Sequence, residues 1–256
     1  MTHNTPANPV QINNPTGRSA AVLVCEHASC DIPSVLDGLG LTEAASQSHA
    51  AWDPGALAVA LRVSQRLDAV LIASTVSRLV YDCNRPPSAP DAMPAKSEIF
   101  DVPGNVGLTQ ADRDARTNTY YLPFQTTLAA QISKMAAPII VTIHSFTPVY
   151  NGQTRAVEIG VLHDTDTRLA DAMLGTAAAH TSALVLRNEP YGPGNGVTHT
   201  LREHALPGGH LNVMLEIRND LIAAPTAQAA MGDMIAAWVA DAVSQITDEG
   251  AVQCVA

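Results

Sequence analysis

Two histidines and a glutamate stand at the ends of apolar segments, where buried strands would bring them to one place. His27 and His144 each follow a run of apolar residues, and Glu216 ends a third such segment. Zinc binds neutral imidazole and carboxylate oxygen, and a catalytic zinc site keeps one position open for water. A carboxylate beside such a site can act as general base and then as proton donor. The pattern predicts a metal site on His27 and His144, with Glu216 as the catalytic carboxylate.

Each of these residues also has a structural interpretation. A strand-end histidine can be a hydrogen-bonded core residue, and Glu216 shares a strand face with Arg218, with which it could form an ion pair. Arg78 and Arg85 are suited to bidentate binding of a substrate carboxylate. Asp82, which lies between them in the sequence, could instead hold both in a salt-bridge cluster. A complete site requires the functional side chains to converge.

The elements that must position these side chains alternate between strand and helix. Apolar, β-branched runs predict strands, and segments with helical spacing and caps lie between them. We predict strands at 20–25, 69–74, 138–144, 156–162, 183–186 and 210–216, and helices at 53–67, 109–134, 167–180 and 226–246. This alternation predicts an α/β domain with a largely parallel sheet. In such a domain the active site lies at the carboxyl edge of the sheet.

Helix caps and chain ends carry further expectations. Asp53 precedes Pro54 and Gly55 and should be the N-cap of its helix. Thr109 should cap the next helix through a capping box with Asp112. The polar, proline-containing residues 1–18 should form a flexible arm, followed by a single domain over 19–256.

Composition narrows the classes of protein. The chain has 256 residues, 46% of them hydrophobic and 15% charged, which is typical of a globular protein. Its net charge of −10 disfavours nucleic acid and anionic membranes as partners. No apolar run approaches the ~20 residues of a membrane span. Because no basic region followed by an apolar one opens the chain, we expect a cytoplasmic protein; the oligomeric state stays open.

Several motifs resemble a known family. His144-Ser-Phe-Thr is similar to the segment with the last zinc ligand of zinc carboxypeptidases, Leu215-Glu-Ile-Arg to their catalytic glutamate segment, and Asp82-Cys-Asn-Arg85 to the Asp-x-Asn-Arg of aspartoacylases. A closer resemblance, over residues 21–222, is to the N-formylglutamate amidohydrolase family. It rests on Cys25-Glu-His-Ala-Ser29, His49-x-x-Trp-Asp-x-Gly-Ala56, Asn195-Gly-Val-Thr-His-Thr-Leu-x-x-His-Ala205 and Glu216-Ile-Arg-Asn-Asp220.

The resemblance implies a fold and an activity. The fold would be zinc carboxypeptidase-like (phosphorylase/hydrolase-like), a three-layer α/β/α sandwich around a mostly parallel mixed sheet. The activity would be hydrolysis of the amide of a small N-acyl amino acid, such as N-formylglutamate, with one zinc per chain. The alternatives are a carboxypeptidase-like amidase acting on peptides or cell-wall fragments, and a non-catalytic binding module on the same fold.

The match assigns the metal ligands in part. His27 corresponds to the first ligand and His144 to the last. The carboxypeptidase pattern His-x-x-Glu, however, meets Cys30 where it requires glutamate. Asp53 is the choice for the third ligand because it lies in a segment that resembles the family, and Glu26 and Cys30 are its rivals.

The same match implies roles at the substrate. Glu216 corresponds to the general base, and Asn84 with Arg85 to a clamp for the substrate carboxylate. Arg78 would polarise the scissile carbonyl or hold the acid group. His199, in the glycine-rich loop before the Glu216 strand, could touch the substrate or the tetrahedral intermediate, or it could be structural.

Two further histidines keep open roles. His204 shares that loop, and His49 could support a metal ligand by a hydrogen bond. Members of the family often carry Pro-His-Ser-Gly at the first motif, where this chain has Glu26-His-Ala-Ser29. This difference indicates a sister branch with a different acyl group or amine.

Overall fold

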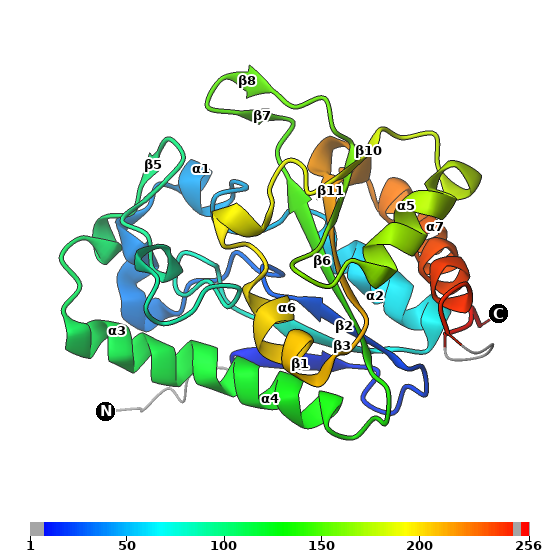
Figure 1. Cartoon of the computed structure of the whole chain (residues 1–256). Coiled ribbons are helices and arrows are strands. Elements are labelled where there is room, and N and C mark those ends of the chain that lie inside the picture. The colour runs from blue at the N-terminus through cyan, green and yellow to red at the C-terminus, as the bar shows by residue number, and fades with distance from the viewer. Residues whose placement is uncertain (1–7, 248–251, 256) are drawn as a thin grey trace.

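A seven-stranded sheet forms the centre of the computed structural model, which describes residues 8–247 and 252–255 (Figure 1). In chain order its strands are β1 (Val10–Asn13), β2 (Ala21–Cys25), β3 (Val70–Ser74), β6 (Ile139–Phe146), β9 (Ile159–Leu162), β10 (Val185–Arg187) and β11 (Asn212–Arg218). Their order across the sheet is β1-β3-β2-β6-β11-β9-β10. The pairs β3–β2, β2–β6, β6–β11 and β9–β10 are parallel, whereas β1–β3 and β11–β9 are antiparallel. The predicted mixed and mostly parallel sheet is confirmed.

Helices flank both faces of the sheet (Figure 1). On one face lie α2 (Ala56–Leu67), α5 (Arg168–His180) and α7 (Pro225–Ser244), and on the other lie α3 (Gln110–Arg116), α4 (Leu122–Ile132) and α6 (His199–His204). Side chains of β2 alternate between the two faces of the sheet. Leu23 packs in the apolar cluster that includes residues of α2, α5 and α7, and Val24 packs in the cluster that includes residues of α4 and α6. Every residue of β2 is buried, as expected of a central strand covered on both sides.

Short elements surround the carboxyl edge of the sheet. They are α1 (Glu43–Ser46), the two-stranded pair β4 (Lys96–Ser97) and β5 (Phe100–Asp101), and the hairpin of β7 (Val149–Tyr150) and β8 (Gln153–Thr154). Because β3, β2, β6 and β11 run in the same direction, their carboxyl ends share this edge. Polar residues that follow these strands are therefore brought together here.

The N-terminal region differs in part from the expected arm. Val10–Asn13 pairs with β3 as an antiparallel edge strand, in which Val10 lies opposite Ser74. The Val10 side chain is buried against the sheet, so burial and strand pairing order this segment. Residues 1–7 of the expected arm lie outside the described residues.

The start of α2 corrects the predicted cap. The N-cap is Gly55, with φ of 82°, and the helix begins at Ala56, so Asp53 is not the cap. A side chain at Gly55 would be strained by that φ and would meet Ile222, because an added Cβ would lie 2.8 Å from the Ile222 carbonyl oxygen. This turn leaves the Asp53 carboxylate free to point elsewhere.

The helix predicted at 109–134 is present but interrupted. Thr109 caps it through the expected capping box with Asp112, and a π-helical stretch at Thr117–Tyr121 separates α3 from α4. The segment at His199–His204, expected as loop, is the short helix α6. None of the helices in the described part of the chain combines the length and apolar character needed to cross a bilayer.

Candidate active site

A cavity of about 330 Å³ lies at the carboxyl edge of the sheet. Of the residues singled out in the sequence, its lining includes His27, His49, Asp53, Arg78, Asn84, Arg85 and Glu216. Strands and their carboxyl ends supply three of these side chains: His27 follows β2, Arg78 follows β3, and Glu216 belongs to β11. His144, on β6, touches His27 and Asp53 from within the protein. The sequence-based expectation that these side chains converge is therefore met.

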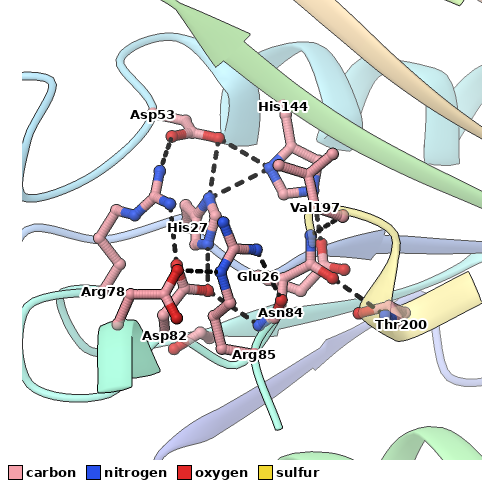
Figure 2. A network of polar contacts seen from close by, with 12 residues as sticks. Glu26, His27, Asp53, Arg78, Asp82, Asn84, Arg85, His144, Val197 and Thr200 are labelled. Atoms are coloured by element: carbon pink, nitrogen blue, oxygen red, sulfur yellow. Dashed lines mark hydrogen bonds and ion pairs between the residues drawn. The ribbon is translucent and has the colours of Figure 1, made fainter. Parts of the chain in front are cut away.

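His27, Asp53 and His144 bring three potential ligand atoms together (Figure 2). Asp53 Oδ2 lies 3.2 Å from His27 Nδ1 and 2.8 Å from His144 Nδ1, and the two nitrogens are 3.1 Å apart. Ligand bonds of ~2.0 to 2.1 Å in a tetrahedral site separate the donor atoms by about 3.3 Å. All three residues are buried. The group can therefore hold a metal ion.

Carboxylates occupy the other ring nitrogen of each histidine. His27 Nε2 lies 2.7 Å from Asp82 Oδ1, and His144 Nε2 lies 3.0 Å from Glu26 Oε2. A carboxylate at Nε2 favours the proton on that nitrogen and leaves the Nδ1 lone pair for a metal. Glu26, a rival for the third ligand, is thus placed as the partner of His144.

Charge in this buried group is balanced between the carboxylates and the histidines. Burial alone would lower the pKa of His144, but the Glu26 and Asp53 carboxylates raise it well above its ordinary value. Burial and Arg78 also oppose protonation of His27, yet the carboxylates around it raise the pKa of His27 as well. The pKa of Asp53 is lowered despite its burial, because both histidines stabilise the carboxylate. A metal cation bound in place of these protons would be stabilised by the same carboxylates.

Glu216 lies beside this group on the neighbouring strand. It is the register partner of His144 in the parallel pair β11–β6. Its Oε2 is buried and has no hydrogen-bond partner among the described residues, and burial raises the pKa of Glu216 to about 7. Arg218 pairs with Asp220 and Glu158, so the alternative ion pair between Glu216 and Arg218 is not formed.

The two arginines of the cavity are engaged in different ways. Arg78 donates to two carboxylates, with Nη1 3.4 Å from Asp53 Oδ1 and Nη2 2.8 Å from Asp82 Oδ2. Arg85 donates from Nε to Asp91 Oδ2 at 2.8 Å, and its Nη1 donates to two backbone carbonyls. Asp91 is more than half exposed, so this second pair is open to solvent. Of the alternative salt-bridge cluster of both arginines on Asp82, only the Arg78 contact is formed.

Asn84 and His199 are tied into the wall of the cavity. Asn84 Nδ2 donates to the Val197 carbonyl at 2.5 Å, and its Oδ1 accepts from the Thr200 backbone N–H at 2.9 Å. Both ends of this amide therefore hold the segment before and inside α6. His199 lies outside the cavity lining, where its Nε2 is 2.8 Å from the Tyr121 hydroxyl and its ring stacks on the tyrosine.

The remaining candidates stand apart from the ligand group. His49 Nε2 lies 2.6 Å from Glu98 Oε2, so it contacts the cavity mouth and no metal ligand. The other Glu98 oxygen accepts from the Asn151 backbone at 2.8 Å, which ties the β7–β8 hairpin to this mouth. Burial lowers the pKa of His204 to about 4. Cys30 is outside the group that can hold a metal.

Tyr191 is a cavity residue that the sequence analysis did not identify. It lines the cavity together with Glu216, and burial, with the Glu216 carboxylate nearby, raises the pKa of Tyr191 to about 12. Arg155 lies over its ring at 4.7 Å. Gly160 permits the approach of this loop, because an added Cβ would lie 2.0 Å from the Glu189 carbonyl oxygen. A tyrosine in a turn-rich loop of a chain with 4% aromatic residues was the available signal.

Similarity to known proteins extends over nearly the whole chain. The family model for N-formylglutamate amidohydrolase matches residues 19–223. The crystal structure of gene product Atu2144 from Agrobacterium tumefaciens is 53% identical with a TM-score of 0.92, over 94% of this chain and 96% of that one. The crystal structure of N-formylglutamate amidohydrolase from Ralstonia eutropha JMP134, 18% identical, shares the fold with a TM-score of 0.58 over 91% and 98% of the respective chains. No curated protein matches this chain.

Proposed function

The chain belongs to the N-formylglutamate amidohydrolase family, and we propose that it is a zinc-dependent hydrolase of a small N-acyl amino acid. N-formylglutamate is the model substrate, and the products are formate and the free amino acid. We place the fold with the zinc carboxypeptidase-like enzymes, on the basis of the His144-Ser-Phe-Thr and Leu215-Glu-Ile-Arg segments on adjacent strands.

One observation carries the proposal: a buried group that can hold a metal ion lies beside a buried carboxyl group at one small cavity. The group is His27, Asp53 and His144, and the carboxyl group is that of Glu216. A metal-binding protein without catalysis has no need for a buried glutamate whose Oε2 lacks a hydrogen-bond partner among the described residues, because its desolvation disfavours the charged form. The combination is what metal-assisted hydrolysis requires.

Zinc fits the donor set of two imidazole nitrogens and one carboxylate oxygen. His27, Asp53 and His144 would hold it, and Asp82 and Glu26 would fix the ring orientations through Nε2. When bound, zinc supplies Lewis acidity, which polarises a carbonyl and makes water more acidic. Three protein ligands leave a position for water or substrate, as in catalytic zinc sites.

Glu216 serves as the general base in this proposal. Its carboxylate takes a proton from the attacking water and later delivers it to the nitrogen of the leaving amine, so the amide C–N bond breaks as formate and a free amine form. A pKa near 7 suits both halves of that transfer. The burial that raises the pKa of Glu216 also limits competing solvent contact.

The cavity favours a small anionic substrate over a peptide. Its volume of about 330 Å³ is at the lower end of the range for ligand pockets. Arg85 offers positive charge on its wall, and we assign it the substrate carboxylate. Asn84 holds the adjoining wall in place through its two hydrogen bonds.

Metal content and turnover together test the proposal. We expect about one zinc per chain by elemental analysis, and chelator-sensitive release of formate from N-formylglutamate within a panel of N-formyl, N-acetyl and N-succinyl amino acids. Hydrolysis of another member of the panel would assign a different acyl group to the substrate and would still support the hydrolysis of an N-acyl amino acid. Zinc binding without hydrolysis of any N-acyl amino acid or peptide would support the binding-module alternative.

A further inference from the structure

Arg78 contacts two carboxylates at the ligand group, which consists of His27, Asp53 and His144. Its Nη1 lies 3.4 Å from Asp53 Oδ1, and its Nη2 lies 2.8 Å from Asp82 Oδ2. Each of these carboxylates turns its other oxygen to His27: Asp53 Oδ2 faces Nδ1 at 3.2 Å and Asp82 Oδ1 faces Nε2 at 2.7 Å. Arg78 thus contacts both the ligand aspartate and the carboxylate that orients the ligand histidine (Figure 2).

Buried negative charge makes this bridge important. Glu26, Asp53, Asp82 and Glu216 are all buried around the two histidines. An uncompensated charge in such an environment is costly, and loss of one partner of a buried pair leaves the other unpaired. Without Arg78, Asp53 Oδ1 and Asp82 Oδ2 would lose their hydrogen-bond donor. The orientation of each carboxylate would then depend on its other oxygen, which also accepts from the backbone N–H of Ser145 and Asn84, respectively.

We propose that Arg78 is a positioning residue of the metal site, which locks Asp53 and Asp82 and thereby sets the affinity for the metal. This inference rests on the proposed zinc site. It replaces the expectation from the sequence that Arg78 polarises the scissile carbonyl or holds the substrate acid group. A planar guanidinium can bridge two carboxylates in fixed directions, which the ammonium of lysine cannot do.

Arg85 provides a matched control within the same cavity. It is also a cavity arginine, but it bonds Asp91 and backbone carbonyls and none of the ligand residues. Its removal should therefore change the binding of an anionic substrate and leave the binding of zinc as it is.

Zinc affinity distinguishes positioning from direct catalysis. The wild type and the variants Arg78→Gln, Arg78→Lys and Arg85→Gln would be stripped of metal and titrated with zinc against a chromophoric chelator. Loss of a group that orients a metal ligand typically costs about 10- to 100-fold in affinity. We expect a loss of this size for Arg78→Gln, a smaller loss for Arg78→Lys, and wild-type affinity for Arg85→Gln.

Saturation with zinc provides a second readout. If Arg78 acts through the metal site, a large part of the kcat lost in Arg78→Lys should return when excess zinc fills the site. Wild-type zinc affinity in both Arg78 variants, with a kcat deficit that persists at saturating zinc, would overturn the inference and leave the zinc hydrolase intact. A wild-type protein that binds no zinc would overturn both the role of Arg78 and the proposed zinc-dependent hydrolase. Circular dichroism would show whether Arg78→Gln is folded. If it is not, the zinc affinity and kcat of Arg78→Lys test the inference.

Discussion

Glu216 stands directly beside His144 across the parallel strands β11 and β6. One of the two side chains belongs to the group that can hold a metal ion, and the other is a buried carboxyl group whose Oε2 lacks a hydrogen-bond partner among the described residues. Strand register fixes this adjacency, so the Glu216 carboxyl group and the His144 ring cannot move apart without breaking the sheet. The division of roles between the two residues is open to direct tests.

Removal of the Glu216 carboxylate should abolish most turnover and spare the metal site. Glu216→Gln keeps the size of the side chain but cannot accept the proton of the attacking water. General-base catalysis by a positioned side chain contributes about 10²- to 10⁴-fold, so kcat should fall by a factor in this range. Steady-state kinetics on N-formylglutamate and zinc analysis of the same preparation would measure both effects.

The exposed Glu203 on α6 supplies the control for this experiment. Glu203→Gln makes the same chemical change away from the cavity lining and should leave kcat and zinc content unchanged. If Glu216→Gln hydrolyses the substrate as fast as the wild type, Glu216 is not the general base.

Much of the candidate site could be predicted because strand ends are visible in the sequence. His27 and His144 follow apolar runs, and Glu216 ends a third, so their convergence needed only a largely parallel sheet. The role of Asp53 was ambiguous, because Asp-Pro-Gly is also a helix start. The structure excludes the cap role, because Gly55, with its positive φ, is the N-cap of α2.

Other features depend on contacts between distant segments, which no local pattern encodes. The pairing of Arg78 with Asp53, or of Asn84 with the backbone of Val197 and Thr200, becomes visible only when the loops meet in space. The same holds for strand β1, whose four residues are ordered by pairing with β3. Propensity alone did not distinguish this segment from a flexible arm.

The three rivals for the third ligand should separate by zinc affinity. Asp53→Asn removes a ligand oxygen and Glu26→Gln removes the charged partner of His144, whereas Cys30 lies outside the group. Loss of such a partner costs about 10- to 100-fold in metal affinity, and loss of a ligand should cost more. We therefore expect a larger fall for Asp53→Asn than for Glu26→Gln in the competition titration.

Cys30→Ser is the matched variant for this series, because it alters the residue that occupies the glutamate position of the carboxypeptidase pattern. It should bind zinc as the wild type does. A loss of zinc affinity in Cys30→Ser with none in Asp53→Asn would identify the Cys30 thiol, and not Asp53, as the third ligand.

Stability of the metal-free protein should fall as the pH rises. The folded pKa of Glu216 is about 7 against an ordinary value of 4.5, and that of His144 is raised well above 6.5. A group that binds protons more tightly in the folded state contributes stability below its unfolded pKa and loses it as the pH passes its folded pKa. Between about pH 5 and 6.5 the lowered pKa of His204 opposes this fall, so the free energy of unfolding should decrease most clearly from about pH 6.5 to pH 9.

Urea denaturation of chelator-treated protein across this range would measure the slope. Asp53 and Asp82, whose pKa values are lowered, have the opposite sign, but their contribution is lost only at acidic pH, below this range. Glu216→Gln should flatten the part of the curve that lies between 4.5 and about 7. An unchanged slope in that variant would contradict the raised pKa of Glu216.

Gly160 should be intolerant of even one added methyl group. It is the register partner of Glu216 in the antiparallel pair of β11 with β9, and an added Cβ would lie 2.0 Å from the Glu189 carbonyl oxygen. Gly160→Ala must therefore push away the loop that carries Tyr191, at a cost of about 1 to 3 kcal/mol for overpacking. Gly175, exposed within α5 with no atom within 4 Å of an added Cβ, is the matched control. Gly175→Ala should stabilise the protein by about 0.5 to 1 kcal/mol and keep full activity. Gly160→Ala should lower both the stability and kcat. Equal behaviour of the two variants in denaturation and turnover would show that the loop does not depend on this close approach.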